Sequence, residues 1–196
     1  MKIYQYRTPD DYVAAQIEAN VRKLNNIWVD KKTIREIASM HPTASNILCH
    51  GTRNAAEQKY FKEYYPQANI IGTEISHTAS QFPMTVQWDF HNVHPDWLKH
   101  FDIVYSNAID HSHDPTRVLA VWRDQLTTTG RMYIEHGYAE TENRSRASDP
   151  LEISDEEIRY LIDLVGMTLI KTFETTGIKG RCASRVYVTE KQHADS

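Results

Sequence analysis

Short apolar runs alternate with helical stretches through most of the chain, and this alternation constrains the fold more than any other feature. The runs begin at Asn46 and read NILCHG, NIIGTEI, MTVQWDF, FDIVYSN and GRMYIEHG. Between them, residues 53–65 and 115–126 have apolar side chains at helical spacing. Strands that alternate with helices form a parallel sheet with helices on both faces. The sequence therefore predicts a doubly wound α/β fold.

The two ends of the chain add helices and a final pair of strands. Residues 10–28 and 31–40 are predicted helices, so residues 1–44 form an N-terminal helical segment. The first helix is expected to bury an apolar stripe of Val13, Ile17, Val21, Leu24 and Trp28. Ser154 and Glu157 form a capping box that begins another helix. After it, MTLIKTFETT and SRVYVTE predict two strands joined through GIKGR. The polar segment ETENRSRASDP, residues 140–150, predicts a loop or lid.

Length and composition limit the classes of protein to consider. A chain of 196 residues supports one well-packed core, so residues 1–196 are expected to form a single domain. No run approaches the roughly 18 apolar residues of a membrane helix, and the N-terminus lacks a signal-peptide pattern. Cys49 and Cys182 lack metal-type spacing, which fits a reducing, cytoplasmic location. The net charge of -4 and dispersed basic residues argue against a nucleic-acid partner without excluding one.

Three predicted strands end in residues suited to nucleoside binding. Gly51 follows the first strand, where glycine lets a ligand approach the backbone and the helix N–H groups. Glu74 ends the second strand about 20 residues later, the offset at which an acid accepts both ribose hydroxyls. Asp89 and Phe90 end the third, where a carboxylate accepts from an exocyclic amine and a ring covers a base. An ordinary turn, a solvated carboxylate and a core aromatic ring are the alternative interpretations.

The fourth run and its continuation, FDIVYSNAIDHSHDPTRVLAVWRDQLTTTGRMYIEHG, resemble the class I S-adenosylmethionine-dependent methyltransferases, with a type 11-like motif order. The resemblance covers about residues 45–137, and the closing helix and two strands are similar to the antiparallel end of the family's sheet. It implies a Rossmann-like fold with a seven-stranded, mostly parallel sheet and an antiparallel last strand. The residues that match the family pattern in order are Phe101, Asp102, Ser106, Asn107, Asp110, His111, Asp114, Pro115 and Gly130.

The resemblance also implies a cofactor, S-adenosylmethionine, and places residues around it. Gly51 is expected under the methionine part, and Glu74 on the ribose. Asp89 and Phe90 are expected at the adenine, and Asn107 near the carbonyl end of the methionine.

The first loop departs from the family pattern. The family has an acidic residue and then three alternating glycines, whereas this chain has Cys49, Gly51, Arg53 and Ala55. The acid normally helps to hold the methionine amino group. Arg53 is predicted to pair instead with the methionine carboxylate through its forked donors. A loop with these side chains is expected to follow a different path.

Methyl transfer is an in-line displacement, so the enzyme positions the acceptor and removes its proton where the nucleophile requires it. His111 and His136, each just beyond a predicted strand, are the candidate bases. Either imidazole is equally compatible with packing against the cofactor or capping a helix. The residues between Asp110 and Asp114 contain metal-ligand types, but no metal is expected because the family pattern explains them.

The favoured hypothesis is therefore a methyltransferase that modifies oxygen or nitrogen of a small or polar acceptor. A noncatalytic binding or regulatory protein of the same fold is the main alternative, because the glycine loop is altered. A metal-dependent hydrolase using Asp110 to Asp114 and perhaps His136 comes next. A dinucleotide oxidoreductase ranks lower, because the first loop lacks GxGxxG. The acceptor, the methylated atom and the oligomeric state stay open.

Overall fold

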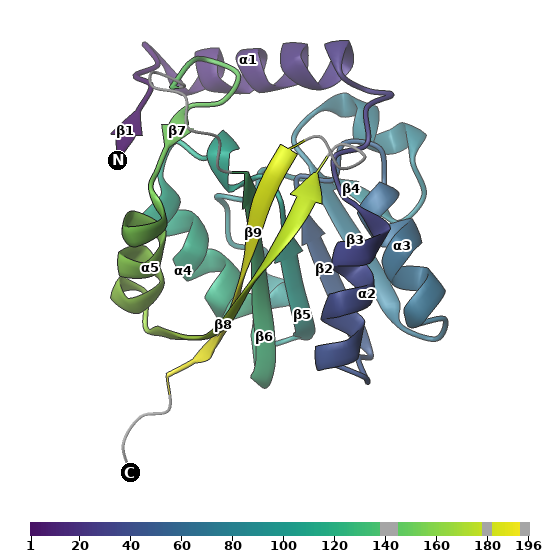
Figure 1. Ribbon diagram of the computed structural model, residues 1–196. Helices are drawn as coiled ribbons and strands as arrows, with labels where there is room; N and C mark the ends of the chain where they lie inside the picture. Colours follow the sequence, from purple (N-terminus) through teal and green to yellow (C-terminus); the bar gives the residue numbers. More distant parts are fainter. Residues whose placement is uncertain (138–144, 178–181, 193–196) are drawn as a thin grey trace.

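The computed structural model describes residues 1–137, 145–177 and 182–192. Its centre is a seven-stranded sheet with the strand order β4-β3-β2-β5-β6-β9-β8 (Figure 1). Strands β2 to β6 are mutually parallel, and β9 is antiparallel to both of its neighbours, β6 and β8. The predicted mostly parallel sheet with an antiparallel last strand is confirmed. The strands are β2 (Asn46–His50), β3 (Asn69–Glu74), β4 (Thr85–Gln87), β5 (Phe101–Ser106), β6 (Leu126–Gly137), β8 (Met167–Gly177) and β9 (Cys182–Lys191).

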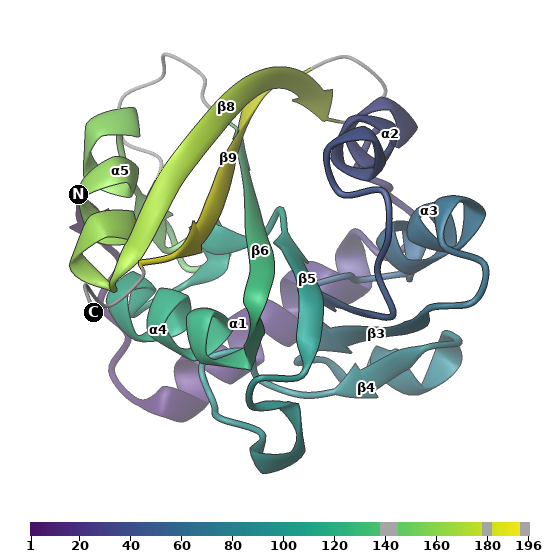
Figure 2. The same cartoon turned by 90° about the horizontal axis from the view of Figure 1, so that it is seen from below.

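Helices cover both faces of the sheet, as Figure 2 shows. Ile47 and Cys49 of β2 pack toward α2 and α3, whereas Leu48 packs toward α4 and α5. This alternation along one strand is the reason that β2 reads as a continuous apolar run. The helices are α1 (Pro9–Arg22), α2 (Lys31–Met40), α3 (Ala56–Tyr64), α4 (Pro115–Gln125) and α5 (Asp155–Leu164), and the 3-10 turns are η1 (His77–Gln81), η2 (Pro95–Trp97) and η3 (Ile109–His111).

The first helix is shorter than predicted and buries a different face. A capping box between Thr8 and Asp11 begins α1, which ends at Arg22 rather than near residue 28. The predicted apolar stripe of Val13, Ile17 and Val21 was wrong, because the side chains that α1 buries are Tyr12, Gln16, Ala19 and Asn20. Half of the Val21 side chain is exposed. The face of α1 that packs against the rest of the protein is therefore partly polar.

The segment between α1 and α2 is fixed to the end of the sheet by Trp28. A Cβ atom on Gly177 would lie 2.5 Å from Trp28 Cε2, and one on Gly137 would lie 3.2 Å from Trp28 Cζ2. The two glycines thus leave room for the indole at the ends of β8 and β6. The side-chain amide of Asn54 also donates hydrogen bonds to the backbone oxygens of Leu24, at 2.8 Å, and of Asn26, at 3.0 Å.

A two-stranded sheet was not predicted. Strands β1 (Lys2–Ile3) and β7 (Leu151–Glu152) pair antiparallel and join the start of the chain to the segment before α5. Strands of two residues carry no periodicity that a sequence pattern can show. The capping box of Ser154 and Glu157 is confirmed, and Cys49 is buried. Of the predicted loop, residues 140–144 lie outside the described residues, and residues 145–150 contact α1 and η3.

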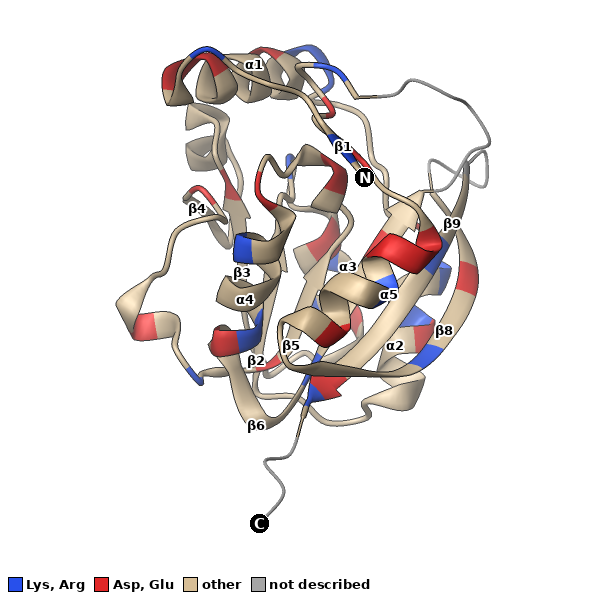
Figure 3. Cartoon of the chain, turned by 90° about the vertical axis from the view of Figure 1, so that its left-hand side faces the viewer, with Lys and Arg blue, Asp and Glu red and all other residues tan. Residues whose placement is uncertain are grey.

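The surface carries charges of both signs. Figure 3 shows Lys and Arg interspersed with Asp and Glu over α1, α5 and β8 rather than gathered into a stripe of one sign. Among the helices of the described ranges, none is long and apolar enough to cross a membrane.

Candidate functional site

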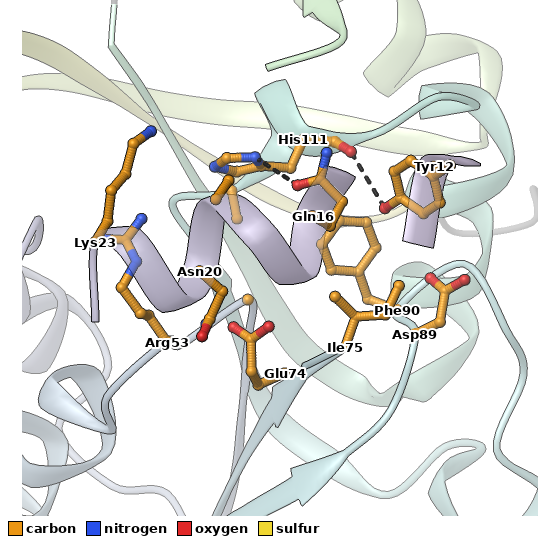
Figure 4. Close-up of a pocket in the computed structure, with 13 residues that line it drawn as sticks. Tyr12, Gln16, Asn20, Lys23, Arg53, Glu74, Ile75, Asp89, Phe90 and His111 are labelled. Carbon is orange, nitrogen blue, oxygen red and sulfur yellow. Dashed lines mark hydrogen bonds between the residues drawn. The ribbon is translucent and has the colours of Figure 1, made fainter. Parts of the chain in front are cut away.

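A pocket opens at the carboxyl ends of β2, β3 and β5, beneath α1 (Figure 4). It holds about 510 Å³ of empty space, including its open mouth. In doubly wound sheets, ligands bind at this edge. The lining residues are Tyr12, Gln16, Ala19, Asn20, Lys23, Gly51, Arg53, Glu74, Ile75, Asp89, Phe90, Ala108 and His111.

Most of the residues singled out from the sequence meet in this pocket. Asn107 and His136 are not among its lining residues. The Asn107 side chain donates instead to Glu57 Oε1, at 3.1 Å, and His136 lies on β6 opposite Arg185 of β9. The sequence-predicted residues that line the pocket are Gly51, Arg53, Glu74, Asp89, Phe90 and His111.

The loop after β2 has left-handed backbone at all three positions where the family pattern has glycine. The φ angles are +71° at Gly51, +40° at Arg53 and +61° at Ala55. Residues other than glycine pay roughly 1–2 kcal/mol to adopt this conformation. The chain therefore keeps left-handed backbone at Arg53 and Ala55, although neither residue is glycine. A Cβ atom on Gly51 would lie 2.5 Å from the Ala108 Cβ, so this position also has no room for a side chain.

Glu74 lies at the end of β3 with its side chain inside the pocket, as predicted (Figure 4). It is only 6% exposed, and its Oε1 accepts a hydrogen bond from the Ser76 backbone N–H at 2.9 Å. Burial raises the pKa of Glu74, although that hydrogen bond and the nearby side chains of His111 and Arg53 oppose the shift. The carboxylate is thus held in place by its own loop.

Asn20 of α1 faces Glu74 and was missed from the sequence. Its Oδ1 accepts a hydrogen bond from the Thr78 hydroxyl at 2.7 Å, and it is 6% exposed. Its Nδ2 is buried and faces the Glu74 carboxylate, where it opposes the rise in the pKa of Glu74. Asn20 therefore helps to hold that carboxylate in place. The spacing of four between Tyr12, Gln16 and Asn20 was the available signal that one helix face is polar and buried.

Asp89 and Phe90 form the opposite wall. Asp89 Oδ1 accepts from the His91 backbone N–H at 3.0 Å and pairs with His91 Nδ1 at 2.7 Å. Burial favours the neutral acid, but these bonds outweigh it and lower the pKa of Asp89. His91 Nε2 in turn lies 3.0 Å from the hydroxyl of Ser112. Phe90 packs edge-on against Trp122, with ring centroids 5.5 Å apart, so it belongs to both the core and the pocket.

His111 enters the pocket from η3, and its orientation is fixed through one ring nitrogen. Nδ1 lies 2.8 Å from the backbone oxygen of Ser148 and 3.0 Å from Gln16 Oε1 (Figure 4). Both neighbours are acceptors, so we assign the proton of the neutral ring to Nδ1, which leaves the lone pair on Nε2. Nε2 is the atom that can accept a proton.

Two carboxylates lie beside this histidine. Asp110, His111 and Asp149 each offer a ligand-type atom within 4.8 Å of the others. Asp149 is also ion-paired with Lys23 and Arg146, so protein cations already balance its charge.

The hydrolase alternative needed a different set of residues. Asp114 caps α4 by accepting from the Arg117 N–H at 3.1 Å, and His136 lies on β6 outside the lining residues. Within the described ranges, neither residue joins the group of Asp110, His111 and Asp149.

Neither a protein-family model nor a curated protein matches the sequence. Solved structures do match the fold. One is the 1,6-didemethyltoxoflavin-N1-methyltransferase of Burkholderia thailandensis with bound 1,6-didemethyltoxoflavin and S-adenosylhomocysteine; it is 15% identical, with a TM-score of 0.77 over 97% of this chain and 93% of that one. The fold is that of the S-adenosylmethionine-dependent methyltransferases.

Two further structures show how wide this methyltransferase fold is. A TehB-like S-adenosylmethionine-dependent methyltransferase from Corynebacterium glutamicum is 20% identical, with a TM-score of 0.62 over 81% of this chain and 86% of that one. The [4+2]-cyclase SpnF is 9% identical, with a TM-score of 0.73 over 98% and 99%. A cyclase shares the fold, so the fold alone does not determine the reaction.

Proposed function

We propose that the protein binds S-adenosylmethionine in the pocket beneath α1 and methylates oxygen or nitrogen of a small, polar acceptor. The observation that carries this proposal is the position of Glu74: a buried carboxylate at the tip of β3, in the same pocket as Gly51 at the tip of β2. That pair meets the two needs of an adenosyl ligand, an acceptor for the ribose hydroxyls and an approachable backbone.

The other lining residues fit the same ligand. Asp89 and Phe90 offer a carboxylate and a ring for the adenine, and Asn20 offers a buried amide beside Glu74. Arg53 lines the pocket and its side chain donates to the Asn26 backbone oxygen at 3.3 Å, so it leaves the pocket open. When bound, the cofactor supplies an activated methyl group on a sulfonium.

The acceptor is proposed to be small because α1 covers the pocket. Gln16, Lys23 and His111 are polar lining residues that the adenosyl assignment does not use. They suit an acceptor with several hydrogen-bonding groups. His111 orients such an acceptor and takes its proton at Nε2, while Nδ1 stays bonded to Ser148.

Equilibrium binding of S-adenosylhomocysteine by titration calorimetry tests the proposal. We expect a saturable, one-to-one isotherm in the micromolar range, and no binding of NAD under the same conditions. Absence of binding at millimolar S-adenosylhomocysteine would refute it.

A protein that binds the cofactor without transferring its methyl group is the second candidate. Two observations support this candidate. The loop after β2 has Arg53 and Ala55 where the family pattern has glycines, and a cyclase has the same fold. A screen of polar metabolites with methyl-labelled cofactor separates the two candidates, because transfer of label to any acceptor excludes a noncatalytic role.

Substitution of His111 tests the proposed base. Once an acceptor is found, His111→Gln is expected to lower kcat by about 100-fold or more, because proton removal is lost. Its affinity for S-adenosylhomocysteine is expected to change less than about threefold, since no adenosyl contact is assigned to it. Steady-state kinetics of His111→Gln and His136→Gln compare the two candidate bases. A larger loss in His136→Gln would reassign the role.

A further inference from the structure

The loop after β2 lacks the acid that the family places before its glycines, and Cys49 stands there instead. Cys49 is fully buried and lies on β2 opposite Tyr105 of β5. Its side chain points to the α2 and α3 side of the sheet. A thiol is shorter than a carboxylate-bearing side chain, so another group can reach this space from α3.

Glu57, in the first turn of α3, reaches it. The Glu57 carboxylate lies close enough to Cys49 to add to the effect of burial in raising the pKa of that thiol. Glu57 is 5% exposed, and its Oε1 accepts the hydrogen bond from Asn107. Its Oε2 is buried and has no hydrogen-bond partner among the described residues.

The surroundings of Glu57 do not balance its charge. Burial raises its pKa to about 7, although hydrogen bonds from its own backbone and Asn107 and the charge of Arg53 oppose the shift. The other titratable groups that face it are Glu135, Tyr105 and Cys49, all buried, and none supplies a positive charge. A buried carboxylate with one unpaired oxygen is unfavourable unless a cation completes it.

Glu57 is not itself one of the lining residues of the candidate pocket, but two neighbours connect it to that pocket. Asn107, its hydrogen-bond partner, precedes Ala108 in the chain, and Ala108 lines the pocket in contact range of Gly51. Arg53, which acts electrostatically on Glu57, lines the pocket too. One anionic and one cationic side chain thus stand at the same loop, as the zwitterion of an amino acid requires.

We propose that Glu57 replaces the missing acid of the loop and binds the α-amino group of the cofactor's methionine part, while Arg53 binds its carboxylate. This assignment rests on the proposed function. It explains why a costly buried carboxylate is present in the first turn of α3, and why Cys49 is tolerated on β2.

The test compares two ligands in three proteins by titration calorimetry: S-adenosylhomocysteine and an analogue that lacks its α-amino group. Wild type is expected to prefer S-adenosylhomocysteine by about tenfold or more, the value of one charge-assisted hydrogen bond. Glu57→Gln is expected to reduce that preference below about threefold and to bind the analogue as wild type does. Glu63→Gln, on the exposed side of α3 and paired with Lys31, is the matched control and is expected to keep the preference.

A second measurement uses wild type alone, so its result does not depend on whether the variant folds. Binding of the ammonium forces Glu57 to ionise, so S-adenosylhomocysteine is expected to release roughly half a proton at pH 7, and the analogue little. Titrations in buffers of different ionisation enthalpy give this number. Equal proton release with both ligands, or an unchanged preference in a folded Glu57→Gln, would overturn the proposal. Failure of wild type to bind either ligand would instead overturn the proposed function.

Discussion

Replacement of Glu74 by glutamine is expected to lower the affinity for S-adenosylhomocysteine by about 100-fold, because one hydrogen bond to the ribose is lost and the other loses its charge assistance. Glutamine has the same length, but one of its two acceptors becomes an amide donor. That donor could no longer accept from a ribose hydroxyl or from the Asn20 amide that faces Glu74. Titration calorimetry of wild type and Glu74→Gln measures the loss.

The 2′-deoxy analogue of S-adenosylhomocysteine supplies the control. Wild type is expected to discriminate against the deoxy ligand, whereas Glu74→Gln is expected to bind both about equally weakly. Equal affinity of wild type for both ligands would show that Glu74 does not hold the ribose.

A measurement of stability distinguishes this loss of ligand affinity from misfolding of the variant. The pKa of Glu74 is raised in the folded protein, so the native state holds its proton more tightly than the unfolded state does. Ionisation of Glu74 therefore lowers stability as pH rises above the unfolded pKa. Glu74→Gln is accordingly expected to be at least as stable as wild type at pH 8 in thermal unfolding.

Gly51→Ala is expected to destabilise the protein by about 2–5 kcal/mol. Roughly 1–2 kcal/mol comes from the left-handed backbone and about 1–3 kcal/mol from overpacking against Ala108. The φ angle of +71° and the 2.5 Å approach of the new Cβ to the Ala108 Cβ are the structural reasons. Urea denaturation measures the change.

Gly166 offers a matched control for the backbone contribution. Its φ angle is +74°, but a Cβ atom there would meet nothing closer than 3.7 Å. Gly166→Ala is therefore expected to lose only about 1–2 kcal/mol. The double variant Gly51→Ala/Ala108→Gly is expected to recover most of the packing loss. A Gly51→Ala protein no less stable than Gly166→Ala would contradict the steric argument.

The sheet could be predicted from the sequence because each central strand is a short apolar run next to a helix. Leu48 and Cys49 serve opposite faces of one strand, so burial on both faces produced a clear signal. The first helix could not be placed as well. Its buried face includes Gln16 and Asn20, which line the pocket instead of packing in the core. The apolar stripe therefore predicted the wrong buried face.

The candidate site was predicted where one strand end determines the position of a residue. Gly51, Glu74 and Asp89 each follow a parallel strand, and the carboxyl ends of parallel strands meet at one edge. Asn20 and Glu57 were missed because their place depends on how helices cross that edge. The four-residue spacing of polar side chains in α1 marks one face of that helix but not the pocket that the face covers, and no local pattern in α3 marks Glu57.

Contacts outside the loop hold Arg53 and Ala55 in left-handed backbone. The Thr52 N–H donates to the Thr73 oxygen of β3 at 3.0 Å, and the Asn54 side chain donates to the Leu24 oxygen at 2.8 Å. The shape of this turn is thus supported by β3 and by the segment that follows α1. A sequence search that requires alternating glycines would miss any chain in which contacts with neighbouring segments, and not glycine residues, stabilise the same loop backbone.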